Sequence, residues 1–403
     1  MKRVFTIICL LSFISIIKSQ TEVKIMYYNI LNFGGNDTDR LDEMRTVFHY
    51  DKPAIFVVNE LESSAAGNNI LTQVANYYDD NYEFAQFTNG PDTDNGFFYD
   101  ADIFTLIDSD IVQTDLRYIN MYKVRHVANQ DTVEMEFYSC HLKASSGSEN
   151  VLKREQEARD LKAYIGDLSM RENVFIGGDF NFYNAAEGGF RVIIDEIGMK
   201  DPLGQTQSWV DWHTNPAYAQ YHTQSPRTTQ FGGGANGGMD DRFDFIFVSE
   251  DVIQGNNNAV YLFDTYKALG NDGLHYNDAI TSLPVNQLYP ETLITALHDL
   301  SDHIPVMMTV ELFPENPSSI QEELDVEMKV YYQAMEVIVS TNSGLSYRGS
   351  YELYDSTGRV VFQEDRELFK GLNTLNIPRN NLAKGTYVLV EKISGIRTKL
   401  IVQ

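Results

Sequence analysis

The stretch NVFIGGDFN, residues 173–181, sets the pattern from which the fold is predicted. Its short β-prone apolar run ends in two glycines, which are followed by Asp179 and Asn181. Five other segments also join an apolar run to polar residues at or near one end: VKIMYYN (23–29), AIFVVNE (54–60), VEMEFYSCH (133–141), RFDFIFVS (242–249) and SDHIPVMMTVELF (301–313). Their polar residues are Asn29, Glu60, His141, Asp244, Asp302 and His303. The pattern predicts strands that each carry polar groups at one end.

Segments with helical spacing of apolar residues lie between these strands. Residues 149–168 are the clearest case, with Leu152 on the predicted apolar face and Ser148 as the predicted N-cap. Residues 41–48 and 70–77 show the same spacing. Alternating strands and helices predict an α/β (α+β) fold in which helices cover buried sheets.

The N-terminus has the layout of a signal peptide. Lys2 and Arg3 precede an apolar run from Val4 to Ile17, and the small residue Ser19 follows. Such a run is too short to cross a hydrocarbon core of ~30 Å, although a short membrane anchor is an alternative. We therefore expect residues 1–19 to be removed, the mature protein to be secreted, and no stable membrane insertion.

The C-terminal region differs from the rest of the chain in composition and in its pattern of apolar residues. Residues 314–327 contain prolines, serines and acidic residues and are predicted to be a linker. Residues 328–403 alternate short strand-like segments with turns, which predicts a small all-β sandwich. The order YELYDSTGRVV, LNIPRNNLAKGTYVLV and TKLIVQ resembles the C-terminal sorting domains of the type IX secretion system of Bacteroidetes. The resemblance implies the secretion machinery as a partner, with the protein released or retained at the outer cell surface; an accessory surface-binding sandwich is the alternative.

Each polar residue of the central segments also has an ordinary structural explanation when it is taken alone. Asn29 could be a turn residue, Glu60 a strand end, and His141 a satisfied buried histidine. Together, however, YNILNF, NELES, HLKAS, GGDFN, RFDFIFVS and SDHIPV, in this order, resemble the endonuclease/exonuclease/phosphatase (deoxyribonuclease I-like) superfamily over residues 22–313, which predicts a catalytic domain over residues 20–313. The resemblance implies a four-layered α/β/β/α sandwich of two packed mixed β-sheets, with the active site at one end of the sheets.

The chemistry of phosphodiester hydrolysis assigns roles to these residues. Hydrolysis needs an activated water, neutralised phosphoryl charge and help for the leaving oxygen. Glu60 is the first candidate ligand for Mg²⁺, with Mn²⁺ or Ca²⁺ as alternatives, and Asn29 and Asp302 would complete or orient the metal shell. His303 is the candidate general base.

The remaining roles follow in part from the resemblance. It implies that Asp244 hydrogen-bonds His303, and Asp179 would hold the attacking water. Asn181 and His141 would donate to the phosphoryl oxygens, and His141 could also protonate the leaving group. The division of acid and base roles between the two histidines stays open, because no carboxylate partner of His141 can be assigned near Asp92 and Asp94.

Two inserted segments are candidates for substrate contact. Residues 205–240 contain Trp209 and Trp212, which could stack on bases or a sugar, and Arg227, which could pair with a phosphate. A packed surface loop is the alternative for this segment. Residues 267–300 could form a second rim.

The formal net charge of −26 argues against a broad basic face that grips a polyanion. The leading hypothesis is an extracellular nuclease that cuts DNA, with RNA as a further substrate. The runner-up is a secreted phosphodiesterase or phosphatase that acts on phospholipid headgroups or small phosphate esters. A non-catalytic surface adhesin is a third hypothesis, but it predicts gaps in the polar set, and every core position is filled.

Overall fold

The computed structural model divides the chain into two compact units, Met1–Asn316 and Pro317–Gln403. It describes residues 21–128, 131–313, 326–332, 336–343, 347–355, 359–369, 371–379, 382–393 and 396–402. The predicted signal peptide and residues 314–325 of the predicted linker lie outside the described residues. In the part that is described, no helix is long and apolar enough to cross a membrane.

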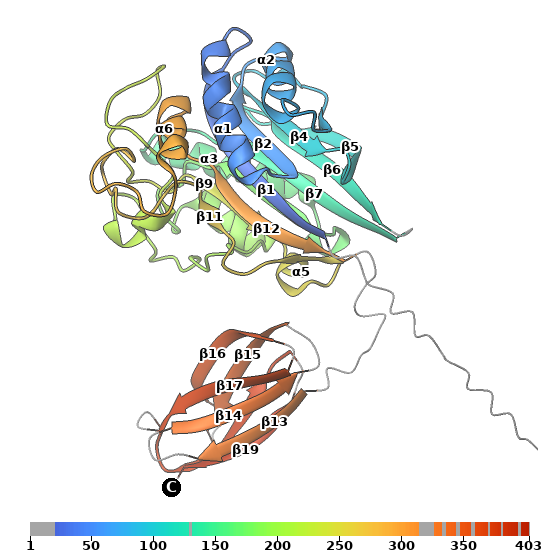
Figure 1. Ribbon diagram of the computed structural model, residues 1–403, viewed down its shortest axis with the longest axis vertical. Helices are drawn as coiled ribbons and strands as arrows, with labels where there is room; N and C mark the ends of the chain where they lie inside the picture. Colours follow the sequence, from blue (N-terminus) through green and yellow to red (C-terminus); the bar gives the residue numbers. More distant parts are fainter. Residues whose placement is uncertain are drawn as a thin grey trace, which may run out of the picture. The chain divides into compact units, whose positions relative to one another are not determined.

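Two mixed β-sheets form the centre of unit 1 (Figure 1). The first has the order β10-β12-β1-β2-β4-β3, with β11 beside β12; the second runs β5-β6-β7-β8-β9 in chain order. The strands of the first sheet are β1 (Thr21–Phe33), β2 (Ile55–Leu61), β3 (Tyr82–Phe84), β4 (Asp94–Asp100), β10 (Ala259–Tyr261), β11 (Lys267–Ala268) and β12 (Val306–Leu312). Those of the second are β5 (Phe104–Val112), β6 (Ile119–Ala128), β7 (Asp131–His141), β8 (Val174–Asp179) and β9 (Asp244–Val248). β1 and β2 pair in parallel, as do β7 and β8, and the other pairs are antiparallel.

Helices cover the outer faces of both sheets. The α-helices are α1 (Leu41–Asp51), α2 (Ser64–Ile70), α3 (Ser148–Ile165), α4 (Gly188–Arg191), α5 (Glu250–Gln254) and α6 (Glu291–Leu300). Short 3-10 or π-helical turns are η1 (Thr38–Arg40), η2 (Leu71–Ala75), η3 (Leu168–Met170), η4 (Val192–Ile197) and η5 (Pro216–Tyr221).

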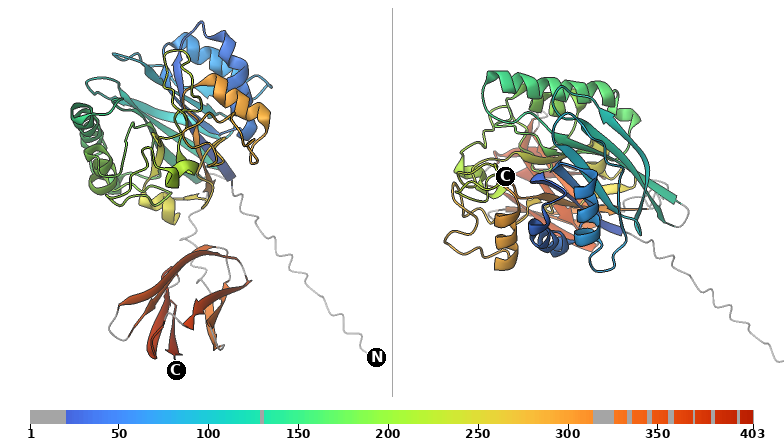
Figure 2. Two further views of the ribbon diagram at one scale, coloured as in Figure 1. Left: turned by 90° about the vertical axis from the view of Figure 1, so that its left-hand side faces the viewer. Right: turned by 90° about the horizontal axis from the view of Figure 1, so that it is seen from above.

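Three apolar clusters hold the layers together. One joins the first sheet to α1, α2 and α6, a second lies between the two sheets, and a third joins the second sheet to α3 and α4. The left view of Figure 2 shows this order, with helices on both outer sides of the paired sheets. The predicted four-layered α/β/β/α sandwich is therefore present, and burial of these apolar faces is its main driving force.

The predicted helices occur at shifted boundaries. The helix expected over residues 149–168 ends at Ile165, because Gly166 follows it with a positive φ of 67°. Its predicted apolar face is wrong at Leu152, which is 64% exposed, and Ser148 is the first helical residue rather than the N-cap. The third predicted helix, residues 70–77, corresponds to the end of α2 and to η2.

Unit 2 contains two antiparallel sheets among its described residues, with the orders β13-β14-β17 and β16-β15-β18-β19. The strands are β13 (Val326–Tyr332), β14 (Glu336–Ser343), β15 (Tyr347–Tyr354), β16 (Val360–Leu368), β17 (Gly371–Pro378), β18 (Gly385–Glu391) and β19 (Arg397–Val402). Side chains from both sheets, such as Val339 and Leu389, share one buried apolar cluster. This small all-β fold agrees with the predicted fold class.

Candidate active site

Strand ends from both sheets bring the candidate residues together. β1 and β2 align Asn29 with Asn59, next to Glu60. In the second sheet, Asp179 at the end of β8 is paired with His141 on one side and with Asp244 on the other. Because the two sheets pack face to face, these positions form one polar cluster at one edge of the sandwich.

Glu60, Asn29 and Asp179 form the acidic centre of this cluster. The Asn29 amide donates to Glu60 Oε1 at 2.9 Å and to Asp179 Oδ2 at 3.1 Å. The backbone N–H of Asn32 donates to the other Glu60 oxygen at 2.8 Å. Burial raises the pKa of Glu60, and burial raises the pKa of Asp179 to about 7 despite the opposing effect of His303. Asn29 therefore orients two carboxylates that are costly to keep charged without a cation.

His303 and Asp244 form a buried pair, as the resemblance implied. Asp244 Oδ2 lies 2.7 Å from His303 Nδ1, and Asp179 Oδ2 lies 3.7 Å from His303 Nε2. Burial opposes charge on the imidazole, but the carboxylates of Asp244 and Asp179 outweigh it and raise the pKa of His303 well above its usual value. Asp244 fixes the ring so that Nε2 faces the acidic centre.

His141 approaches the same carboxylates from the opposite side. Its Nε2 lies 3.5 Å from Asp179 Oδ2 and 3.8 Å from Glu60 Oε1. Its buried Nδ1 has no hydrogen-bond partner among the described residues. Burial, together with the charge of Arg117, lowers the pKa of His141 well below its usual value, so the neutral imidazole is favoured.

The region near Asp92 and Asp94 supplies no carboxylate to His141. Asp92 pairs with Arg117 at 2.8 Å, and Asp94 accepts the backbone N–H of Gly90 at 2.6 Å. Neither Asp92 nor Asp94 is therefore the carboxylate partner of His141, because both are engaged elsewhere.

Asp302 lies beneath the glycine-rich part of the 205–240 insert. Its Oδ2 accepts the backbone N–H of Ala235 at 2.6 Å, while Oδ1 is buried and has no partner among the described residues. A Cβ on Gly234 would stand only 2.8 Å from the Asp302 carboxyl carbon. The insert thus approaches Asp302 as closely as a glycine backbone allows.

The structure changes the expectation for Arg227. Its side chain is buried, its Nη2 donates to the carbonyl of Ser301 at 2.6 Å, and the guanidinium lies 4.4 Å from the centre of the Phe231 ring. These contacts hold Arg227 against the turn that carries Asp302 and do not favour its pairing with a substrate phosphate, which stays a prediction.

The two tryptophans have opposite environments. Trp209 is 79% exposed and remains available to a ligand. Trp212 is fully buried against Phe190 and Phe245, and its indole N–H donates to the Phe182 carbonyl at 2.8 Å. The prediction that Trp212 contacts substrate is wrong, because its ring is part of the core.

Asn181 follows Asp179 on a left-handed backbone, with φ 53°. Its N–H donates to Asp179 Oδ1 at 3.0 Å, and its amide contacts the Leu142 carbonyl at 3.3 Å. These contacts place Asn181 beside the end of β7, near His141. Its role as a donor to the phosphoryl oxygens stays a prediction.

A buried polar network supports the site from below and was not predicted. Asn59 accepts the backbone N–H of Asp179 at 3.1 Å and donates to Asn95 at 2.6 Å, which in turn donates to Asn120 at 2.8 Å. This chain of amides links the two sheets directly under the acidic centre. The one available signal was the placement of Asn59 next to Glu60 and of Asn95 at the start of an apolar strand.

Gly178 explains why β8 can approach this network. It has φ 125°, and a Cβ there would lie 2.1 Å from the carbonyl oxygen of Cys140. Any other residue would separate the ends of β7 and β8, where His141 and Asp179 stand.

The donor set fits a hard divalent cation. Asp179, Asp244 and Asp302 are buried carboxylates and Glu60 is a partly buried one beside them, and Oδ1 of both Asp244 and Asp302 lacks a partner among the described residues. Ligand atoms of Asp179, Asp244 and His303 also lie within 4.8 Å of one another. Because Asp244 already holds His303, we regard Glu60, Asp179 and Asp302 as the better oxygen ligands. Asn29 donates to Glu60 and Asp179, which agrees with the prediction that it orients the metal ligands.

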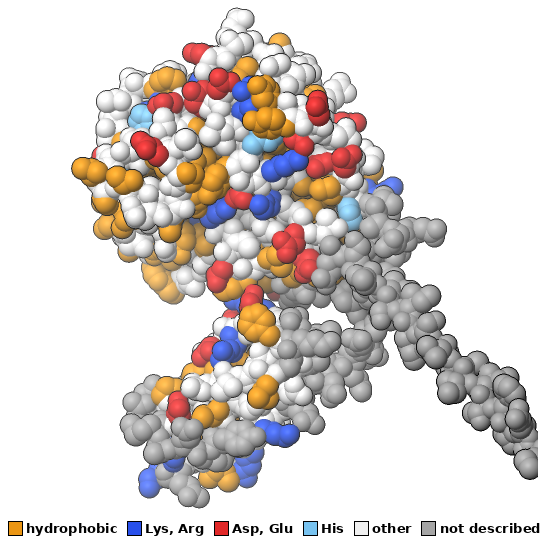
Figure 3. Space-filling view, viewed as in Figure 1, with side chains coloured by type: hydrophobic (Ala, Val, Ile, Leu, Met, Phe, Trp, Pro, Cys, Tyr) orange, Lys and Arg blue, Asp and Glu red, His pale blue; other side chains and the backbone are white. Residues whose placement is uncertain are grey.

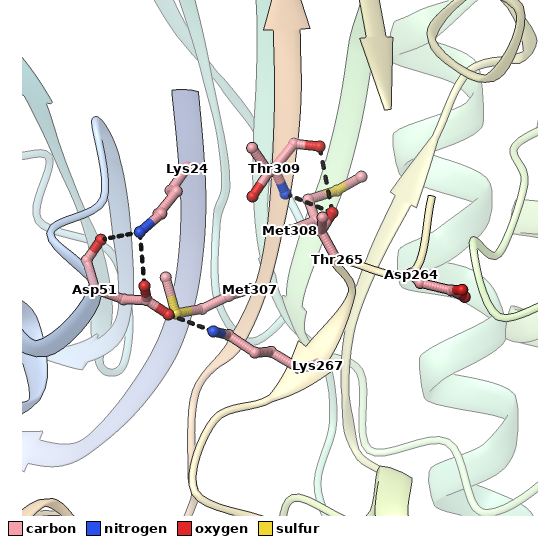
Figure 4. A pocket seen from close by; sticks show the side chains of 8 residues that line it. All are labelled: Lys24, Asp51, Asp264, Thr265, Lys267, Met307, Met308 and Thr309. Atoms are coloured by element: carbon pink, nitrogen blue, oxygen red, sulfur yellow. Dashed lines mark hydrogen bonds and ion pairs between the residues drawn. The ribbon is translucent and has the colours of Figure 1, made fainter. Parts of the chain in front are cut away.

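A small cavity elsewhere has a different character. It has a volume of about 180 Å³ and lies beside the N-terminal part of β1 and the first half of β12, where Lys24 and Lys267 both bind Asp51 (Figure 4). None of the candidate site residues lines this cavity, so it is separate from the candidate site.

Comparisons with known proteins add likenesses of fold but no relative in sequence. No protein-family model matches the chain, and no curated protein matches it. An endonuclease/exonuclease/phosphatase family protein from Bacteroides thetaiotaomicron is 14% identical over 73% of this chain and 96% of its own, with a TM-score of 0.47.

Two further solved structures have similar values. A mannosyl-6-phosphatase from Bacteroides thetaiotaomicron is 15% identical over 72% of this chain and 99% of its own, with a TM-score of 0.45. TDP2 from D. rerio, complexed with single-strand DNA product, is 15% identical over 72% of this chain and 99% of its own, with a TM-score of 0.43. At these identities and scores, the likenesses assign neither activity nor substrate to this chain.

Proposed function

We propose that unit 1 is a divalent-metal-dependent phosphodiester hydrolase. The observation that carries the proposal is the Asp244–His303 pair, which is directed at a buried carboxylate cluster with oxygen ligands for a cation. Bound Mg²⁺, or Mn²⁺ or Ca²⁺ in its place, would neutralise phosphoryl charge and stabilise the departing oxygen. Glu60, Asp179 and Asp302 would hold it.

The chain's own residues divide the remaining work. Asp244 holds His303 so that Nε2 can take a proton from the attacking water, and Asp179 accepts a hydrogen bond from that water. His141, as a neutral imidazole, donates one hydrogen bond to a phosphoryl oxygen, and Asn181 donates another. The geometry favours His303 as the base, because it alone of the two histidines has a carboxylate on its far nitrogen.

We propose DNA as the leading substrate, with RNA as a further one. Support comes from exposed Trp209 on the 205–240 insert, since an exposed indole can stack on a base. The metal, rather than a basic protein surface, would neutralise the phosphate, which suits a chain with a net charge of −26.

A specific observation favours phospholipid headgroups as a second candidate. Leu274, Leu283, Val285 and Leu288 are all exposed, Leu283 by 83%, on the loop that precedes α6. Figure 3 shows hydrophobic side chains at the edge of unit 1 over the loops beside α6. Residues 268–313 contain no Lys or Arg. Such an apolar, non-basic edge suits a neutral amphiphile surface better than a polyanion.

The experiment is a substrate panel with the full chain. Plasmid DNA, RNA, sphingomyelin vesicles and bis(4-nitrophenyl) phosphate are each incubated with Mg²⁺, Mn²⁺ or Ca²⁺ and with EDTA. We expect metal-dependent cleavage of DNA and of the generic diester. Sphingomyelin turnover without DNA cleavage would replace the nuclease with the lipid alternative, and no turnover of any substrate would reject the hydrolase.

We also propose that the protein is exported, with residues 1–19 removed and unit 2 acting as a sorting domain. The support is the sequence pattern of the two termini. Mass spectrometry of the protein from its native host should find a mature N-terminus near residue 20 in the extracellular or outer-surface fraction. An intact N-terminus in the cytoplasmic fraction would reject this proposal.

A further inference from the structure

Gln224 stands next to His303 in a short three-stranded ladder. Isolated antiparallel bridges pair Gln224 with His303 on one side and with Asp241 on the other. The backbone N–H of Gln224 donates to the Asp241 carbonyl at 3.1 Å, and the N–H of Ile304 donates to the Thr223 carbonyl at 2.9 Å. Residues that face each other in antiparallel bridges project to the same side. The side chains of His303, Gln224 and Asp241 therefore form a row.

The Gln224 amide lies against the reactive nitrogen of His303. Its nitrogen is 2.6 Å from His303 Nε2, while Asp244 occupies Nδ1 on the other side of the ring. The neighbouring carboxylates favour the protonated ring, but a general base acts from its neutral form. In that form Nδ1–H is donated to Asp244, and Nε2 accepts the amide N–H of Gln224, whose nitrogen is the atom placed against it. Nε2 is the nitrogen that must accept a proton from water if His303 is the base.

The backbone that carries Gln224 is anchored on its far side as well. Asp241 pairs through its carboxylate with His213 Nδ1, and the His213 ring contacts Tyr183 edge to face, with 4.7 Å between ring centres. Both neighbours in the row are thus fixed. The Gln224 amide occupies Nε2, so its side chain has to turn before water can bind to that nitrogen.

We infer that Gln224 is a further catalytic residue, whose amide leaves His303 and donates a hydrogen bond to a phosphoryl oxygen when substrate binds. The inference rests on the proposed function. An amide N–H that is 2.6 Å from the base already stands beside the place of the reacting group. It is uncharged, so it can stabilise phosphoryl charge without competing with the carboxylates for the metal. Gln224 itself neither gains nor loses a proton in this role.

Kinetics of the full chain test the inference, with bis(4-nitrophenyl) phosphate and Mg²⁺. Gln224→Ala removes the donor, and Gln224→Glu keeps the shape but replaces the amide donor by an acceptor. We expect kcat to fall about 100-fold in both variants, as for loss of one oxyanion donor, with KM changed less than threefold. Inorganic phosphate should also inhibit both variants more weakly. Gln230→Ala, at an exposed position six residues along the same segment, is the matched control and should behave as the wild type.

The outcomes separate this inference from the proposed function. A wild-type kcat in folded Gln224→Glu would overturn the donor role, and so would an increased kcat in Gln224→Ala, because the amide would then only compete with water. If Gln224→Ala unfolds, the isosteric glutamate variant still decides. If the wild-type chain itself shows no turnover, the proposed function fails before Gln224 is tested.

Discussion

The two histidines of the site face the same carboxylate from opposite sides, yet their surroundings differ. His303 has Asp244 on Nδ1 and Gln224 on Nε2, and its pKa is raised by neighbouring carboxylates. His141 has no partner on Nδ1 among the described residues, and burial and Arg117 lower its pKa. The surroundings of His303 thus stabilise the protonated ring, which is the form that a general base reaches when it takes a proton, whereas those of His141 favour the neutral ring. The two rings lie at similar distances from Asp179, but their different neighbours favour different roles.

The largest expected effect is on the His303 side. His303→Ala should lower kcat by about 10⁴-fold, since a general base contributes up to that amount. Asp244→Asn should lower it by about 10³-fold, because the amide no longer holds the imidazole as a proton acceptor. The measurement is single-turnover hydrolysis of bis(4-nitrophenyl) phosphate with Mg²⁺, with circular dichroism as the folding control. A loss of less than tenfold in either folded variant would remove His303 from the base role.

A smaller effect is expected on the His141 side. His141→Ala should lower kcat by about 100-fold through loss of one donor to the phosphoryl oxygen. His141→Gln keeps an N–H donor and should recover part of this loss. Equal effects for His141→Ala and His303→Ala would contradict the contrast between the two rings and restore an acid role for His141.

The smallest effect concerns Glu157, a buried carboxyl that contacts the chain just after His141. Glu157 accepts the backbone N–H of Lys143, two residues after His141, and burial raises the pKa of Glu157 from 4.5 to about 7. The folded state therefore holds this proton more tightly than the unfolded state. The resulting stability is present below pH 4.5 and is lost as pH rises through about 7.

Glu157→Gln should remove the loss of folding stability at high pH, because glutamine does not ionise. At pH 8 the variant should be more stable than the wild type by about 2 kcal/mol, and the advantage should vanish near pH 4. Urea unfolding at both pH values provides the measurement. An exposed glutamate, Glu149→Gln, serves as the control. A variant that is less stable than the wild type at pH 8 would show that the Lys143 contact outweighs the cost of burial.

The layers of the fold were predictable from sequence because strand runs and helical spacing report burial directly. VFIGGD and DFIFV are fully buried strands, as their apolar runs indicated. The exact face of a helix was less predictable. Leu152 is nine residues before Leu161, about 180° around α3 from it, so this apolar side chain lies on the exposed face, opposite the buried Ala158 and Leu161.

Within the site, the residues at strand ends were found because the strands themselves carry them. Glu60, His141, Asp179, Asp244 and His303 each lie at or beside the end of a predicted strand, and the structure places them together. The roles assigned to them remain predictions.

The environments of residues in the insert 205–240 could not be predicted from the sequence. Trp209 and Trp212 stand three positions apart in the same polar stretch, and only the fold shows that one is exposed and the other buried. Gln224 belongs to no strand pattern. It reaches His303 only because its backbone bridges to that residue, a contact between positions 79 residues apart.

The most direct test asks whether turnover depends reversibly on the metal and also requires His303. The full chain is assayed on bis(4-nitrophenyl) phosphate with Mg²⁺, then with excess EDTA, and again after Mg²⁺ is restored, in parallel with His303→Ala. We predict that the wild type loses turnover in EDTA and regains it with Mg²⁺, while His303→Ala stays inactive throughout. Turnover that persists in EDTA, or in folded His303→Ala, would contradict a metal-dependent hydrolase with His303 as its base.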